Sequence, residues 1–160
     1  MKEGTTLFLK IAIMIIAIPI IALCLFGLPL IAKEAGRGSV KMAYVMYGIL
    51  TIMYVSAIPF FTALYQGFKL LSYIDTNQAF SDISVVALKK IKNAATTISI
   101  MYVVAMPLFY VVGEIDDAPG IIIIGMIFIF APMTIAVFAA VLQKLLKHAI
   151  DIKNDNDLTI

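Results

Sequence analysis

Four long runs of uncharged residues constrain this chain more than any other feature of its sequence. The runs cover residues 11–32, 42–68, 93–113 and 118–143, and each contains 21 to 27 residues. A helix needs about 20 apolar residues to cross the hydrocarbon core of a bilayer. With 62% hydrophobic and 14% charged residues, the chain has too little polar surface for a water-soluble domain. The sequence therefore predicts an all-α integral membrane protein, folded as one four-helix bundle over residues 1–160.

The charged residues between these runs set the boundaries and the orientation. We expect membrane spans at about residues 8–32, 42–68, 93–113 and 119–143, a connector at 69–92, and an amphipathic extension and tail at 144–160. Basic residues favour the cytoplasmic side of a membrane. With both termini inside, nine basic residues lie inside and three outside. The nine are Lys2, Lys10, Lys69, Lys89, Lys90, Lys92, Lys144, Lys147 and Lys153, and the three are Lys33, Arg37 and Lys41. We therefore expect a multi-pass protein of the plasma membrane, with cytoplasmic termini.

Every predicted span also contains a proline. The four are Pro19, Pro59, Pro107 and Pro132. Proline removes one backbone hydrogen bond and frees the carbonyl oxygen four residues earlier, so we expect kinked helices. The kinks could form a cavity or a hinge, or they could simply reflect the tolerance of membrane helices for proline.

The residues offer little to an enzyme or to a cofactor. The chain has one histidine, His148, and one cysteine, Cys24, and no acid lies within any of the four runs. A nucleophile with its base, or a metal centre, needs more of these groups than the chain supplies. We expect no catalytic residues, no cofactor and no resident metal. A net charge of +2 and the lack of a polar domain also argue against direct binding of nucleic acid.

Three carboxylates gather in the short turn between the third and fourth spans. They are Glu114, Asp116 and Asp117, and no cation lies near them in the sequence. Oxygen ligands in such a cluster are weak candidates for binding a divalent cation or a cationic peptide. Alternatively, the acids only mark the end of the hairpin on the outer side.

The connector is the longest polar interruption in the chain, with the sequence KLLSYIDTNQAFSDISVVALKKIK. Its short polar residues at 75–78 predict a turn. Ser81 followed by Asp82 predicts the start of a new helix. Because Lys89, Lys90 and Lys92 fall on one arc of that helix, we expect it to lie along the lipid headgroup layer before it enters the membrane.

The C-terminal segment continues the helical pattern of the fourth span beyond Gln143. Asn and Asp at residues 154–157 predict the end of that helix. The last three residues predict a β-prone end that could add to the edge of a partner's sheet. The connector and this end together predict a docking surface for a cytoplasmic partner, comprising Phe80, Lys89, Lys90, Lys92, Leu158, Thr159 and Ile160.

Two stretches carry a resemblance to a known family, LLSYIDTNQAFSDISVVALKKIK and AVFAAVLQKLLKHAIDIKNDNDLTI. The chain resembles the bacterial membrane proteins grouped as domain of unknown function 2975 (DUF2975). The likeness is most specific at Asp75, Ala79, Phe80, Ser81, Leu88, Ile91 and residues 157–160. It implies a four-helix membrane protein that is often encoded beside a small helix-turn-helix regulator of the Cro and cI type. It implies no catalytic residues.

Three functions are compatible with these patterns. The first is a regulatory or sensory membrane protein that docks a cytoplasmic transcriptional regulator of the helix-turn-helix type. The second is a small transport or self-immunity protein that handles a lipid, an apolar solute or an antimicrobial peptide. The third is a structural bundle that forms a homo-oligomer.

Overall fold

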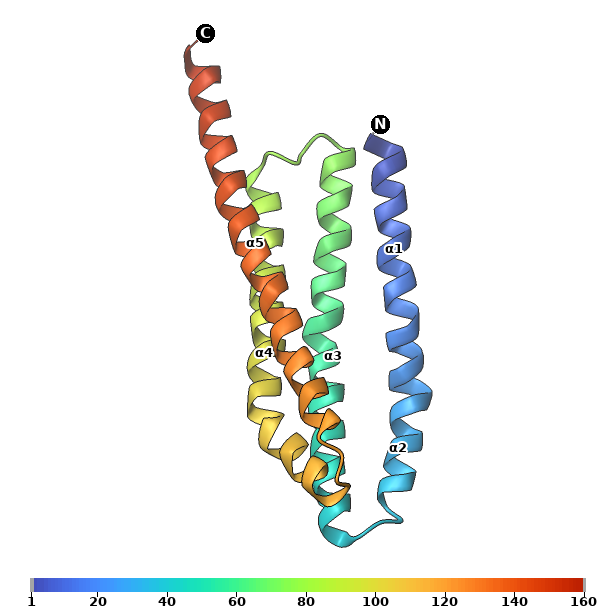
Figure 1. Cartoon of the computed structure of the whole chain (residues 1–160). Coiled ribbons are helices and arrows are strands. Elements are labelled where there is room, and N and C mark those ends of the chain that lie inside the picture. The colour runs from blue at the N-terminus through green and yellow to red at the C-terminus, as the bar shows by residue number, and fades with distance from the viewer. Residues whose placement is uncertain (1, 160) are drawn as a thin grey trace.

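The protein consists almost entirely of helices. The computed structural model describes residues 2–159, with side chains from residue 4 to residue 158. In chain order the elements are α1 (Lys2–Ala22), the π-helical turn η1 (Leu23–Gly27), α2 (Leu28–Ala35), α3 (Val40–Asp75), α4 (Asp82–Ile115) and α5 (Gly120–Thr159). The first three elements join end to end and form one long helical segment, so the molecule has four such segments (Figure 1). All four are long and apolar enough to cross a membrane, which confirms the predicted all-α membrane fold.

Helix α4 is the central element of the arrangement. It packs against α3 and against α5, while α1 and α2 pack against α3. Both labelled termini lie at the same end of the molecule as the loop between α3 and α4 (Figure 1). The loop between α2 and α3 and the turn between α4 and α5 lie at the other end. Which of these two ends faces the cytoplasm stays a prediction.

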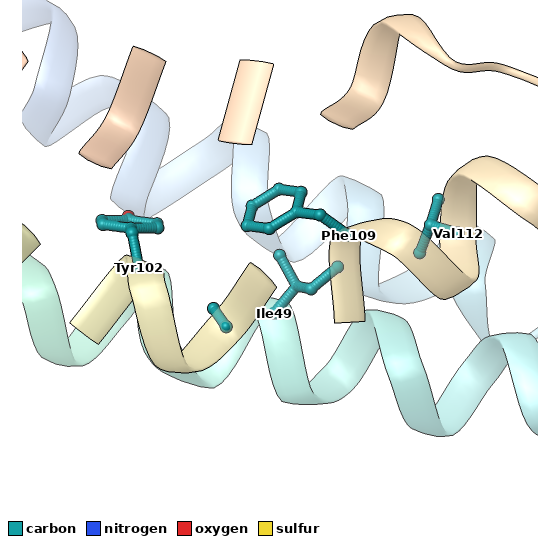
Figure 2. Packing of buried hydrophobic residues seen from close by; sticks show 5 residues of the cluster. Ile49, Tyr102, Phe109 and Val112 are labelled. Carbon is teal, nitrogen blue, oxygen red and sulfur yellow. The ribbon is translucent and has the colours of Figure 1, made fainter. Parts of the chain in front are cut away.

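The apolar core lies where α4 meets its neighbours. Its buried residues are Ile49, Tyr102, Ala105, Phe109 and Val112 (Figure 2). The Tyr102 ring stacks on Phe128 of α5, with 5.0 Å between ring centroids. The Tyr102 hydroxyl forms a hydrogen bond with the Ser56 hydroxyl on α3, with 2.9 Å between the two oxygen atoms. One side chain of α4 therefore links both neighbouring helices.

Helices α4 and α5 approach each other closely because small residues line their contact. The fully buried Ser99 hydroxyl donates to the backbone carbonyl oxygen of Ile129, at 2.8 Å. A Cβ atom added at Gly125 would lie 3.0 Å from the sulfur of Met106. Small residues let helix backbones come together in lipid, where a polar group also gains by finding a partner on the next helix.

The four prolines lie inside α1, α3, α4 and α5 as their positions in the sequence imply. Kinks at these prolines stay a prediction. The π-helical turn η1 was not predicted. Pro29 follows it closely and has no N–H to donate, and the Leu28 N–H bonds to the Leu23 carbonyl oxygen five residues earlier. The carbonyl oxygen of Cys24 in this turn accepts a hydrogen bond from the Tyr54 hydroxyl of α3, at 2.7 Å.

Candidate docking surface at the connector end

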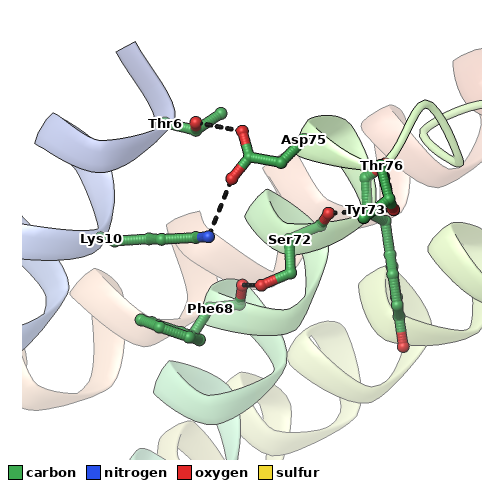
Figure 3. Close-up of polar contacts among 7 residues, drawn as sticks. All are labelled: Thr6, Lys10, Phe68, Ser72, Tyr73, Asp75 and Thr76. Carbon is green, nitrogen blue, oxygen red and sulfur yellow. Dashed lines mark hydrogen bonds and ion pairs between the residues drawn. The ribbon is translucent and has the colours of Figure 1, made fainter. Parts of the chain in front are cut away.

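A polar cluster ties α1 to α3 at the end of the molecule that holds the connector. The Lys10 ammonium nitrogen lies 2.8 Å from a carboxylate oxygen of Asp75, and the Thr6 hydroxyl donates to the other oxygen (Figure 3). The same ammonium group lies 5.2 Å from the centre of the Phe68 ring. We call Thr6, Lys10 and Asp75 the α1–α3 clamp. The sequence predicts Asp75 only as part of a turn, because its partners lie more than sixty residues earlier.

The clamp also explains how an acid is accommodated at this position. Asp75 is the last residue of α3, where the negative end of the helix dipole disfavours a carboxylate. The hydrogen bonds from Lys10 and Thr6 lower the pKa of the Asp75 carboxyl below its ordinary value. Asp75 therefore stays ionised at neutral pH, beyond the predicted end of the span at residue 68.

The turn that follows the clamp has the hydrogen bonds of a Schellman motif. The Gln78 N–H bonds to the Tyr73 carbonyl oxygen at 2.7 Å, and the Asn77 N–H bonds to that of Ile74 at 3.2 Å. Asn77 has a φ of 61°, in the left-handed region that asparagine tolerates. The predicted turn and the predicted start at Ser81 are thus confirmed, although the Ser81 hydroxyl donates to the Gln78 carbonyl oxygen and does not cap the helix.

The lysine-rich part of the connector is the first stretch of α4 and not a separate helix. Helix α4 runs unbroken from Asp82 to Ile115, and its early residues Ser84 and Leu88 are buried. The expectation that this segment lies along the headgroup layer was therefore wrong, because its inner face packs inside the bundle. Lys89 and Lys90 are exposed and Lys92 is half-buried.

Phe80 and the connector lysines stay candidates for docking, but they do not form one surface with the end of the chain. Phe80 is exposed in the loop before α4. Figure 1 shows the last turns of α5 extending past the loop between α3 and α4. Leu158 is 84% exposed, the side chain of Thr159 is not described, and Ile160 lies outside the described residues. The structure thus divides the predicted surface into two parts.

The C-terminal segment is helical through Thr159, so the predicted break at residues 154–157 and the β-prone end were wrong. Asn and Asp lower helix stability by only a few tenths of a kcal/mol each relative to better helix formers. Adding residues to a helix that already exists avoids the large cost of nucleation. The long helix α5 therefore continues through four unfavourable residues. The remaining prediction for this segment is a helical extension, not an extended strand.

Within residues 2–159, most of that extension has no helix beside it (Figure 1). Because Ser99 meets Ile129 and the two helices are antiparallel, Asp82 lies level with about residue 146 of α5. Beyond that level α5 projects from the bundle (Figure 1). Leu145, at about that level, and Ile152, beyond it, are 61% and 55% exposed, and their spacing of seven residues places them on one face. We call these two residues the α5 stripe.

The three carboxylates of the acidic turn at the opposite end are not gathered around one point. Glu114, Asp116 and Asp117 are all exposed. Among residues 2–159, no three His, Cys, Asp or Glu side chains come together as a metal centre would require. Asp117 instead occupies the left-handed position of a second Schellman motif, with a φ of 50° and the Ala118 N–H bonded to the Gly113 carbonyl oxygen at 2.9 Å. The structure therefore gives this turn a structural role.

Comparisons with known proteins agree with the membrane fold. Residues 30–160 match the family described as "Protein of unknown function (DUF2975)". Over all 160 residues, the chain is 60% identical to a protein of Bacillus subtilis (strain 168) described as "Uncharacterized membrane protein YoaS", and the match covers the full length of both. No solved structure matches. The chain is a multi-pass membrane protein, and it belongs to the DUF2975 family.

Proposed function

We propose that this membrane protein acts without catalysis, as a docking protein for a cytoplasmic regulator of the helix-turn-helix type. The observation that carries the proposal is the α5 stripe. Crossing a bilayer requires about 20 residues, whereas α5 has 40 and ends well beyond the level of its neighbours. A membrane anchor alone does not need this extension.

The extension has the chemistry of a helix that binds in an apolar groove. Leu145 and Ile152 supply exposed apolar anchors on one face, two turns apart. Lys144, Lys147 and Lys153 are exposed on the same segment. A partner with an apolar groove and an acidic rim would match both features, because opposite charges steer the encounter and apolar contacts hold the complex. The family resemblance supports a helix-turn-helix regulator as that partner.

The test is a pull-down in mild detergent from cells that express the regulator encoded beside the protein. We expect the wild-type chain to retain the regulator. The double variant Leu145→Asp, Ile152→Asp should retain about tenfold less regulator than wild type, because charges would enter an apolar contact. Lys147→Gln serves as the control on the same segment and should retain most of the binding. Circular dichroism should show equal helix content in all three proteins.

The terminal residue needs its own variant. By helical spacing, Leu158 lies thirteen residues after Leu145 and so on nearly the opposite face of α5. Leu158→Asp therefore distinguishes a partner that encloses the helix end from one that covers only the α5 stripe. A wild-type protein that retains no regulator, or a stripe variant that retains it fully, would refute docking and favour the transport or self-immunity function.

A further inference from the structure

A surface groove runs between α3 and α4, and the described residues that line it all belong to these two helices. Its volume is about 420 Å³. At one end it is lined by Lys90 and Asn93, and deeper in the membrane by Ile58, Pro59 and Met101. None of the residues that line it belongs to the α1–α3 clamp or to the α5 stripe. The groove is therefore a separate feature from the proposed docking segment.

The walls of the groove are apolar in their chemistry even where the side chains carry hydroxyls. Thr62 donates its hydroxyl to the Ile58 carbonyl oxygen at 2.9 Å, and Thr97 donates to that of Asn93 at 2.8 Å. Each hydroxyl proton is thus bound within its own helix. An acyl chain can lie against such walls without leaving a polar group unpaired.

The charge at the mouth of the groove is uncompensated. Lys90 is exposed, and no acidic side chain in the described part of the chain forms an ion pair with it. Lys89 on the preceding position is also exposed but does not line the groove. A phosphate group at this mouth would meet an ammonium group and the Asn93 side chain at the level where the predicted span begins.

The length of the groove matches one leaflet of a bilayer. Lys90 and Met101 are eleven residues apart on α4, which corresponds to about 16 Å along a helix. The hydrocarbon core is about 30 Å thick, so the groove extends through about half of it. A headgroup at Lys90 would place the acyl chain of the same lipid beside Met101.

We propose that this groove binds an anionic phospholipid of the leaflet at the connector end, with its phosphate at Lys90 and Asn93 and an acyl chain along Ile58, Pro59 and Met101. Basic mouths between transmembrane helices are suited to anionic headgroups. A zwitterionic lipid such as phosphatidylcholine also carries a phosphate, but its choline ammonium offsets that charge, so it would gain less from the lysine than an anionic lipid would. Selectivity for negative charge is therefore the property that separates a specific site from ordinary lipid-facing surface.

The chain contains no tryptophan, so a single introduced tryptophan reports on one position. Ile58→Trp places it in the groove, and Phe130→Trp places it on α5 as a control. The two sites lie at similar depth, because Ser56 meets Tyr102 while Ser99 meets Ile129. They are also similarly exposed, at 69% and 61%. Each variant is reconstituted in phosphatidylcholine bilayers that contain either brominated phosphatidylglycerol or brominated phosphatidylcholine at equal mole fraction.

From the quenching of the tryptophan at position 58, we expect an apparent binding constant about fivefold higher for brominated phosphatidylglycerol than for brominated phosphatidylcholine. At position 130, both lipids should quench the fluorescence equally. In the Ile58→Trp background, Lys90→Gln should remove the preference, while Lys90→Arg and Lys89→Gln should keep it. Equal quenching by both lipids at position 58, the same preference at position 130, or a preference that survives Lys90→Gln would each overturn the proposal.

Discussion

Single residues join helices that the apolar surfaces alone would hold loosely. Lys10 and Asp75 lie on α1 and α3, and only a quarter or less of each side chain is exposed. Most of α1 faces outward, so few other contacts set its position against α3. Lipid is as apolar as the helix faces themselves and gives no hydrophobic force between helices. Polar contacts such as the α1–α3 clamp therefore matter more to the placement of α1 than similar contacts would in a water-soluble protein.

We expect Lys10→Gln and Asp75→Asn to lower the melting temperature by a few degrees each, and the double variant to cost little more than either alone. Such non-additivity identifies a direct pair. The ion pair of Arg37 with Glu34 is the control, because its side chains are 77% and 71% exposed. The corresponding amide variants there should change stability by less than about 1 kcal/mol. Additive losses at the clamp would contradict a direct interaction.

The clamp also predicts how stability depends on pH. The pKa of the Asp75 carboxyl is lowered in the folded protein, so its ionised form is favoured by folding. Its contribution is fully present above the unfolded pKa of about 4 and is lost as the pH falls through the lowered folded value. Thermal unfolding in detergent should show a difference between wild type and Asp75→Asn that is constant from about pH 5 to 8 and shrinks below about pH 4. A difference that changes near pH 6 or 7 would assign the effect to another group.

At the scale of elements, two helices end in the same way without glycine. Asn77 and Asp117 occupy the left-handed positions of Schellman motifs after α3 and α4. Asn and Asp adopt this conformation at lower cost than other residues with a side chain, because their short polar groups can bond locally. These two turns therefore set where α3 and α4 stop, and so where the connector and the acidic turn begin.

We expect Asn77→Val to destabilise the protein by at least about 1–2 kcal/mol, because a β-branched residue is strained in the left-handed region. Asn77→Gly should leave stability unchanged or raise it by up to about 1 kcal/mol. Asn154→Val, at an exposed position inside α5, is the matched control and should cost only a few tenths of a kcal/mol. The free energy of unfolding of all three variants is measured in mixed micelles. Equal losses of stability from the valine substitutions at positions 77 and 154 would show that backbone strain is not the cause.

At the scale of the whole molecule, the connector, the N-terminus and the C-terminal extension lie at one end (Figure 1). The segments at that end of the molecule contain nine basic residues, and the segments at the other end contain three. The resulting bias is large enough to orient a chain of this size by the positive-inside rule. We therefore predict that the α5 stripe lies in the cytoplasm and the mouth of the groove at the inner leaflet.

Thiol labelling on intact cells tests this orientation. In a Cys24→Ala background, single cysteines replace Gly36, Gln78 or Asn156, all of which are exposed. Gln78 is chosen because the neighbouring Asn77 has the strained backbone. An impermeant reagent should label only the cysteine at position 36, while all three should react after the cells are permeabilised. Labelling at position 78 or 156 on intact cells would reverse the topology and remove the basis of cytoplasmic docking.

Sequence alone determined the features that depend on local composition. The four runs predicted four membrane helices because only a helix satisfies its own backbone groups in lipid over such lengths. The polar residues at 75–78 predicted the turn, and Ser81 predicted the start of α4, because short polar side chains favour helix ends. These signals act within a few residues of one another, so no knowledge of packing was needed.

Only the tertiary structure decided which faces of the helices pack. Ser99 is fully buried and Ile58 is mostly exposed, yet both lie in uncharged runs. In a bilayer the lipid is as apolar as the protein core, so the pattern of hydrophobic residues does not show which face of a helix packs against other helices and which faces lipid. The α1–α3 clamp joins residues more than sixty positions apart, and the groove needs two antiparallel helices side by side. Such features depend on contacts between residues that are far apart in the sequence. The C-terminal end of α5 is helical for another reason: extending an existing helix costs little, and this outweighs the weak local preference of Asn and Asp for other conformations.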